Sequence, residues 1–264
     1  YLWFICLVAS SGGLLFGYDV IVVSGVIPQV IKQYNLTPSQ LGFLVSSVLW
    51  GCAIGSGLSG FLLDFFGRKK VLITAAFMLF ISALWSSLAI SPMILISARL
   101  IGGIGCGMAT TACPPYISEV SPENKRGRMV SLYHFAVCSG IVICVFVNWG
   151  IFSFSETNTD SIVYPAFFQW FVVEQSWRAM LASEAIPGVL FLGLAFALPE
   201  SPRWLIKYKR NNEAESILTK INGSQRANQI CTEIRNTVRI DNELAFFNLF
   251  SDQLRKPFFL AILI

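Results

Sequence analysis

Residues 3–28 read WFICLVASSGGLLFGYDVIVVSGVIP, an apolar run of 26 residues with one ionisable side chain, Asp19. A helix needs about 20 mainly apolar residues to cross the hydrocarbon of a bilayer. The run therefore predicts a membrane-spanning helix. It is too long for a signal peptide and lacks the basic leader that a signal peptide carries. Five further stretches meet the same criterion: 40–63, 71–90, 93–115, 129–151 and 179–198.

The composition of the whole chain also indicates a membrane protein. Only 13% of the 264 residues are charged, whereas soluble domains carry about 25%. The 22 Phe and 7 Trp argue against disorder, and a net charge of +4 without a dense basic face argues against nucleic-acid binding. The seven cysteines lack CxxC spacing, so we expect neither a disulfide framework nor a metal site and interpret the thiols as small packing residues.

The basic residues predict the orientation of the spans, because positive charge is retained on the cytoplasmic side of a membrane. Sixteen of the nineteen Lys and Arg follow the second, fourth and sixth spans. We therefore expect both ends of the chain to be cytoplasmic and the spans 1–198 to form one bundle in the inner or plasma membrane.

The residues after the sixth span differ in composition. Residues 199–256 are rich in charge and predict a cytoplasmic helical domain, in which Asn222-Gly223 ends one helix and Ser224 caps the next. Residues 257–264 contain too few apolar residues to cross a bilayer and predict the start of a truncated seventh span. The chain also begins on Tyr1, so we expect the 264 residues to be the first half of a longer protein.

Three ionisable residues, Asp19, Arg99 and Glu184, lie inside spans. A charge at the bilayer centre costs about 2.5 to 3.5 kcal/mol even on insertion scales, so such residues pair or line a water-filled path. Counted from the outer ends of their helices, all three lie at similar depth. They are interpreted either as a static ion pair that fixes helix packing or as a relay that titrates during transport.

Glycines and other small residues recur four apart in the first, second and fourth spans, a pattern that favours close helix packing in lipid. Five motifs follow one another in the order typical of one family. They are GGLLFGYD (12–19), DFFGRK (64–69), RLIGGIG (99–105), PPYISE (114–119, followed by Pro122 and Arg126-Gly127) and PESPRW (199–204). The chain resembles the sugar porters of the major facilitator superfamily.

This resemblance implies an all-α fold of twelve helices in two six-helix halves, with sugar bound between the halves and access alternating between the two sides. It assigns proton coupling to Asp19, Arg99 and Glu184. Arg99 would leave Asp19 for Glu184 when Asp19 takes a proton. Facilitative members of the family have a neutral residue in place of this aspartate.

The resemblance also places a few sugar contacts in this half. His134 stands where the family has a glutamine, and Ile141 stands where a second polar contact can occur. An imidazole can still bond a hydroxyl, although His134 could instead be a packing residue. Phe16 resembles an apolar wall of the sugar site, and a core- or lipid-facing role is the alternative.

A set of charges resembles the family's cytoplasmic gate, which closes the inner mouth by salt bridges. An alternative role for its arginines is to anchor the topology and contact lipid phosphates. The residues of this set are Asp64, Gly67, Arg68, Glu119, Arg126, Glu200 and Arg203.

The hypothesis for function is sugar–proton symport, with a facilitative sugar, polyol or inositol carrier or a transporter-like sugar receptor as alternatives. An enzyme is not expected, because no nucleotide loop, metal cluster or nucleophile–base pair is recognisable. We expect no cofactor and no metal. The expected partners are a sugar, a proton, the lipid bilayer and the missing carboxy-terminal six-helix half, without nucleic acid.

Overall fold

The computed structural model describes residues 1–158 and 164–243, and these ranges contain helices and no strand. The chain divides into two compact units, Tyr1–Ser201 and Pro202–Ile264. The seventh span predicted at 257–264 lies outside the described residues.

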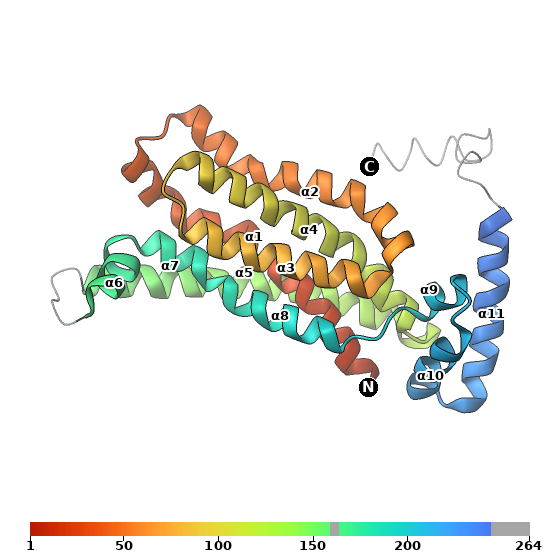
Figure 1. The fold of residues 1–264 in the computed structure, drawn as a ribbon. Helices are drawn as coiled ribbons and strands as arrows, with labels where there is room; N and C mark the ends of the chain where they lie inside the picture. Colours follow the sequence, from red (N-terminus) through yellow and green to blue (C-terminus); the bar gives the residue numbers. More distant parts are fainter. Residues whose placement is uncertain (159–163, 244–264) are drawn as a thin grey trace. The chain divides into compact units, whose positions relative to one another are not determined.

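Within the described residues of the first unit, six helical segments are long and apolar enough to cross a membrane (Figure 1). The predicted all-α fold with six spans is confirmed. The segments are α1 (Leu2–Tyr34), α2 (Pro38–Phe66), α3 (Arg68–Ser87), α4 (Pro92–Val120), α5 (Arg126–Thr157, after the short η1 Glu123–Lys125) and the pair α7 (Ser176–Ser183) and α8 (Ala185–Ala197). Between α5 and α7 lie α6 (Ala166–Phe168) and a π-helix, η2 (Gln169–Glu174).

Local sequence explains several helix ends. Thr37 and Gln40 form a capping box at the start of α2, and Ser91 accepts a hydrogen bond from the Ile94 N–H at the start of α4. Asn35 ends α1 in the left-handed conformation, with φ of 48°. Each of α2 and α4 begins with a proline, where a missing N–H costs nothing.

Several helices extend past their predicted spans. The prediction ended the first span at 28 and the fourth at 115, whereas α1 continues to Tyr34 and α4 to Val120. Apolarity marks the part that crosses hydrocarbon, but a helix continues wherever its backbone bonds and packing remain favourable. In α4 the residues after Pro115 are held by burial, since Tyr116, Ile117 and Val120 are at most 1% exposed.

The sixth span, predicted at 179–198, is found over Ser176–Ala197 and is interrupted at Glu184. α7 ends at Ser183, Glu184 lies in the turn, and α8 begins at Ala185. Pro187 explains the interruption, because it has no N–H to donate to the carbonyl of Ser183 and its ring crowds that carbonyl. The break places Glu184 at a helix end.

Close backbone approach determines which helices pair. α2 packs mainly against α4, and α1 mainly against α5. A methyl group at Gly51 or Gly55 of α2 would collide with the backbone of α4, and one at Gly17 of α1 would collide with the backbone of α5. The small residues four apart therefore form the helix contacts that their spacing predicted.

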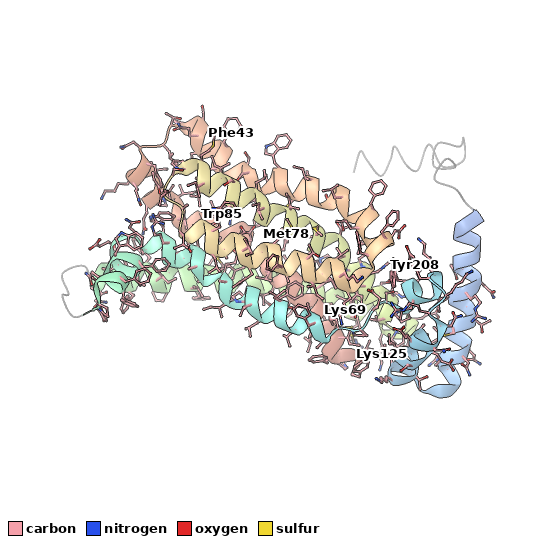
Figure 2. All side chains as sticks on the ribbon, in the orientation of Figure 1. Phe43, Lys69, Met78, Trp85, Lys125 and Tyr208 are labelled. Carbon is pink, nitrogen blue, oxygen red and sulfur yellow. The ribbon has the colours of Figure 1, made fainter. Side chains whose placement is uncertain are left out.

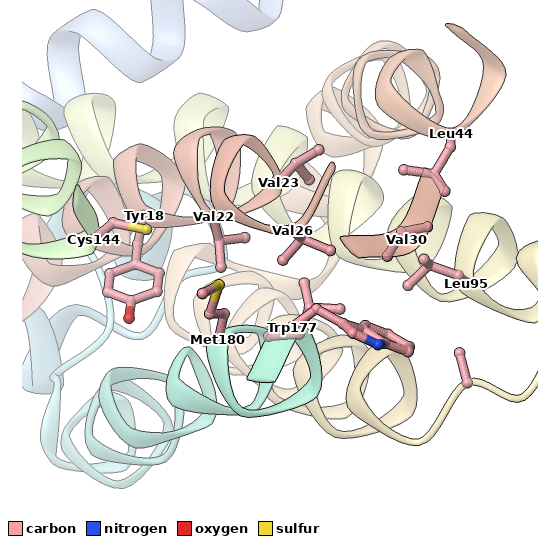
Figure 3. Packing of buried hydrophobic residues seen from close by; sticks show 12 residues of the cluster. Tyr18, Val22, Val23, Val26, Val30, Leu44, Leu95, Cys144, Trp177 and Met180 are labelled. Atoms are coloured by element: carbon pink, nitrogen blue, oxygen red, sulfur yellow. The ribbon is translucent and has the colours of Figure 1, made fainter. Parts of the chain in front are cut away.

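Apolar side chains lie both in the interior and on the outer surface of the first unit. A buried cluster joins α1 to α4 and α7 through residues such as Val26, Leu95 and Trp177 (Figure 3). Large apolar side chains such as Phe43 and Trp85, labelled in Figure 2, are 68% and 44% exposed. Such an apolar exterior suits a helix bundle surrounded by lipid.

The second unit is described over α9 (Pro202–Lys207), α10 (Asn211–Asn222) and α11 (Ser224–Glu243). Trp204, Leu205 and Ala214 form its small core, and Cys231 packs against it. Burial raises the pKa of the Cys231 thiol, which keeps it protonated at neutral pH.

A glycine separates α10 from α11 in the second unit. Gly223, with φ of 81°, ends α10 as predicted. α11 begins at Ser224, the residue predicted to cap it, and the Gly223 carbonyl accepts a hydrogen bond from the Ala227 N–H. A glycine serves both ends because it tolerates positive φ.

Candidate functional site

An ion pair lies buried in the middle of the first unit. Nη1 of Arg99 on α4 lies 2.6 Å from Oδ1 of Asp19 on α1, and Nη2 donates to the main-chain carbonyl of Asp19 at 2.8 Å. The side chains of Asp19 and Arg99 are 1% and 3% exposed. Two hydrogen bonds to one residue hold the guanidinium in a single orientation.

Glu184 is the third buried ionisable residue of this region, at 2% exposure. It faces Asp19 and Arg99, whose charges both act on it. Within the described residues its Oε1 has no hydrogen-bond partner. The structure thus brings together the three ionisable residues that the sequence singled out, and it pairs Arg99 with Asp19.

The neighbours of this site explain its geometry. The hydroxyl of Tyr18 lies 2.6 Å from Oγ of Ser183, so α1 and α7 are joined directly beside Asp19 and Glu184. Gly102 leaves room on α4, where an added methyl group would meet Ser82 and approach Oδ1 of Asp19.

Sequence reasoning missed one member of the site, Cys106. Its thiol donates to Oδ2 of Asp19 at 3.5 Å and is fully buried. The cysteines were interpreted as packing residues, and for Cys106 this interpretation is incomplete. The signal available was its position seven residues after Arg99, which places both side chains on one face of a helix. Asp19, Arg99, Cys106 and Glu184 are called the central cluster below.

The predicted sugar-contacting residues follow the seam between α1 and α5. A methyl group at Gly17 of α1 would meet the backbone of Val137 and Ile141, so the residue after Phe16 contacts the turn that carries Ile141. Phe16 and Ile141 are half-buried, whereas His134 is exposed, with its ring 5.5 Å from that of Tyr133. Their contact with sugar stays a prediction.

A second set of charges lies where α2, α3, α4 and the end of α8 meet. Nη2 of Arg68 is 2.8 Å from Oε1 of Glu119, and Nη1 is 3.9 Å from Oδ1 of Asp64. The other oxygen of Glu119 accepts a hydrogen bond from Oγ of Ser201 at 2.5 Å. We call Asp64, Arg68, Glu119, Glu200 and Ser201 the end cluster.

Glu200 caps α3 from a distant part of the chain. Its Oε1 accepts hydrogen bonds from the main-chain N–H groups of Arg68 and Lys69 at 2.8 and 3.1 Å, and from that of Ser201 at 2.9 Å. The N-terminus of a helix favours a negative charge. Gly67, with φ of 88°, provides the turn and the space, because a methyl group there would collide with the Glu200 carboxylate.

Two further residues predicted for the gate belong to other elements. Arg126 begins α5 and is exposed. Arg203 belongs to α9 of the second unit. The structure thus joins Asp64, Gly67, Arg68, Glu119 and Glu200, and adds Ser201, which sequence reasoning did not assign to the gate. Over the described ranges, no group of three or more His, Cys, Asp or Glu side chains could hold a metal ion.

Six apolar spans around a buried ion pair, with a charge network at one end, define a polytopic membrane protein of the transporter class. The family described as "Sugar (and other) transporter" matches residues 5–264, and the chain belongs to this family. Its members are transporters and not enzymes. The predicted resemblance and the major facilitator fold are confirmed.

Two curated relatives and one solved structure illustrate the similarity. The chain is 40% identical to the arabinose-proton symporter of Bacillus subtilis over 256 residues, covering 97% of this chain and 53% of the relative. It is 38% identical to the D-xylose-proton symporter of Escherichia coli K12 over 267 residues, covering 90% and 51%. The structure of the proton:xylose symporter XylE bound to 6-bromo-6-deoxy-D-glucose matches with a TM-score of 0.83 at 35% identity, covering 94% of this chain and 55% of that one. The chain spans about half the length of these curated relatives.

Proposed function

We propose that this chain is the amino-terminal half of a sugar–proton symporter that works by alternating access. The observation that carries the proposal is the central cluster, in which Arg99 holds a buried carboxylate on α1 while a second buried carboxylate faces the pair. Relatives at 34 to 40% identity are named as proton symporters of arabinose and xylose, which supports a pentose or a similar sugar as substrate.

The central cluster offers Arg99 a second acid as partner. Arg99 has one anionic partner at hydrogen-bond distance, Asp19, and Glu184 has an acceptor, Oε1, without a partner among the described residues. When Asp19 takes a proton, its attraction for Arg99 falls and Arg99 turns toward Glu184. Proton binding and sugar binding then favour the same rearrangement, which is the thermodynamic requirement for symport.

The sugar site in this half is proposed along the seam of α1 and α5, with Phe16 as an apolar wall and His134 and Ile141 facing the ligand. A lost hydrogen bond to a bound hydroxyl costs about 0.5 to 1.5 kcal/mol. His134→Ala is therefore expected to weaken sugar binding about three- to tenfold while the amount of folded protein in the membrane stays the same. Unchanged affinity would return His134 to a packing role.

The end cluster is proposed to close the cytoplasmic mouth when the site faces outward. This assignment follows the positive-inside rule, which places both ends of this chain in the cytoplasm of a cell whose plasma or inner membrane holds the protein. The apolar outer side chains of the bundle would contact lipid, and a second six-helix half would supply the rest of the sugar site.

Uptake of labelled sugars by the full-length protein, with and without a protonophore, tests the proposal. The parent should accumulate a pentose or hexose until the protonophore is added. Asp19→Asn should lose accumulation and keep both sugar binding and exchange of labelled for unlabelled sugar, because neither process needs net proton movement. Glu123→Gln, which makes the same carboxylate-to-amide change at an exposed position of η1, serves as control.

Accumulation by Asp19→Asn at the level of the parent would overturn proton coupling at this residue. A facilitative carrier or a different coupling ion would then be the better assignment.

A further inference from the structure

Both oxygens of the Asp19 carboxylate are held from one helix. Oδ1 accepts a hydrogen bond from Nη1 of Arg99 at 2.6 Å, and Oδ2 accepts one from the thiol of Cys106 at 3.5 Å. Arg99 and Cys106 lie seven residues apart on α4, on the same face of the helix. The carboxylate is therefore oriented as a whole, and its two oxygens are not equivalent.

Close packing of α2 against α4 keeps the thiol in place. Cys106 is fully buried, and Gly107, the next residue, packs against the carbonyl of Cys52 on α2. A side chain with no branch beyond Cβ and a weak donor at its end fits this narrow space. Cys113, also fully buried on α4, is two turns further along the helix and lies instead beside Gly12.

We propose that Cys106 is a positioning residue of the coupling site, which holds Oδ2 of Asp19 and thereby sets the proton concentration at which Asp19 is loaded. The inference rests on the proposed function and deepens it. Arg99 occupies Oδ1 at short distance, so the incoming proton bonds to Oδ2. The thiol hydrogen points at that same oxygen in the ionised form and must turn away when the proton arrives.

The donor therefore opposes proton loading, since a hydrogen bond made to the charged form of a carboxylate favours that form. The surroundings of Asp19 contain several other titratable or charged groups that contribute to the same balance. They are Arg99 from α4, Cys144 from α5, Glu184 between α7 and α8, and Cys52 from α2, whose thiol also lies beside that of Cys106.

The first experiment compares the pH dependence of proton-driven uptake in full-length variants. Cys106→Ala removes the donor, so the pH of half-maximal uptake should rise by about 0.5 unit. Cys106→Ser supplies a stronger donor, so the midpoint should fall. Cys113→Ala and Cys113→Ser, with the same changes at a buried thiol of α4 beside Gly12, should keep the midpoint of the parent.

Opposite shifts for alanine and serine at position 106 support the inference, because damage to packing would move both variants in the same direction. Shifts in one direction, or unchanged midpoints in variants that still take up sugar, overturn it.

A second experiment tests the contact between the Cys106 thiol and the Asp19 carboxylate without measuring transport. The S–H stretching band of Cys106 in the infrared spectrum of the full-length protein in lipid is assigned by its loss in Cys106→Ala. In Asp19→Asn this band should move to the frequency of a weaker hydrogen bond, because an amide oxygen accepts less strongly than a carboxylate. A band that stays in place overturns the thiol–carboxylate contact. If the parent protein takes up sugar equally well with and without a protonophore, the proposed function alone is overturned, and this infrared measurement remains valid.

Discussion

The central cluster and the end cluster use the same residue types in different surroundings. In the central cluster, the side chains of Asp19 and Arg99 are 1% and 3% exposed, and Oε1 of Glu184 has no partner among the described residues. In the end cluster, Arg68 and Glu119 are 14% and 12% exposed, and both oxygens of Glu119 accept hydrogen bonds. Both arginines leave Nε without a partner in the described part of the chain, so the difference lies in the acids.

This difference indicates two roles, a change of ion pairing in the central cluster and a structural connection in the end cluster. A buried arginine that faces two carboxylates has a second partner available, so a proton can change the pairing. The end cluster instead joins four segments, with hydrogen bonds to both oxygens of Glu119, and Oε1 of Glu200 caps a helix. Substitutions in the central cluster should therefore alter proton coupling or folding strongly. Substitutions in the end cluster should have smaller effects, and these should decrease as the substituted residue is more exposed.

The largest effect is expected for Arg99→Ala. Removing one partner of a buried ion pair costs about 3 to 5 kcal/mol, because the other charge is left without compensation. The full-length variant should show a marked loss of folded protein in the membrane, measured by thermal unfolding in detergent. Adding Asp19→Asn should recover part of the stability but not proton-driven uptake. A single Arg99→Ala variant as stable as the parent would show that the pair does not hold the fold.

Gly67→Ala should have the next largest effect. A residue with φ of 88° strains an alanine backbone by about 1 to 3 kcal/mol, and the new methyl group would displace the Glu200 carboxylate from α3. The unfolding temperature should fall. Gly57→Ala on α2, where an added methyl group meets no described residue within 4 Å, is the matched control and should be neutral or stabilising. Equal effects of the two changes would argue against the cap.

Glu200→Gln should be milder. The amide oxygen can still accept hydrogen bonds from α3, but the favourable charge at the helix end is lost, at a cost of about 0.3 to 1 kcal/mol. The destabilisation should shrink as salt is added, because the helix-end field is screened. A loss that is independent of ionic strength would indicate a packing effect. Unfolding curves at low and high salt measure this.

Asp64→Asn should have the smallest effect. The Asp64 side chain is 61% exposed and lies 3.9 Å from Arg68 in an i, i+4 pair. Such pairs contribute about 0.3 to 0.5 kcal/mol at a surface. When the unfolding of the two variants is measured side by side, Asp64→Asn should lose less stability than Glu200→Gln. A larger loss would move Asp64 into the buried part of the network.

Several features of the site could be predicted from particular residues. Asp19, Arg99 and Glu184 stood out because a charge inside an apolar run is costly, and three such charges at similar depth can meet. The end cluster was found through motifs that resemble a family. Cys106 was missed because a thiol in an apolar run is not unusual, and its role depends on the carboxylate that a different helix brings to it.

The sequence by itself determined the membrane class, the six spans and the candidate charges, because hydrophobicity and charge are properties of each stretch of chain read alone. Only the tertiary structure decided that Arg99 bonds Asp19 while one oxygen of Glu184 has no partner among the described residues, and that Glu200 caps a helix that begins 132 residues earlier in the chain. Which side chains pair depends on how closely the helix backbones approach, on the break before Pro187 and on the direction of each side chain. These features arise only when the helices pack together.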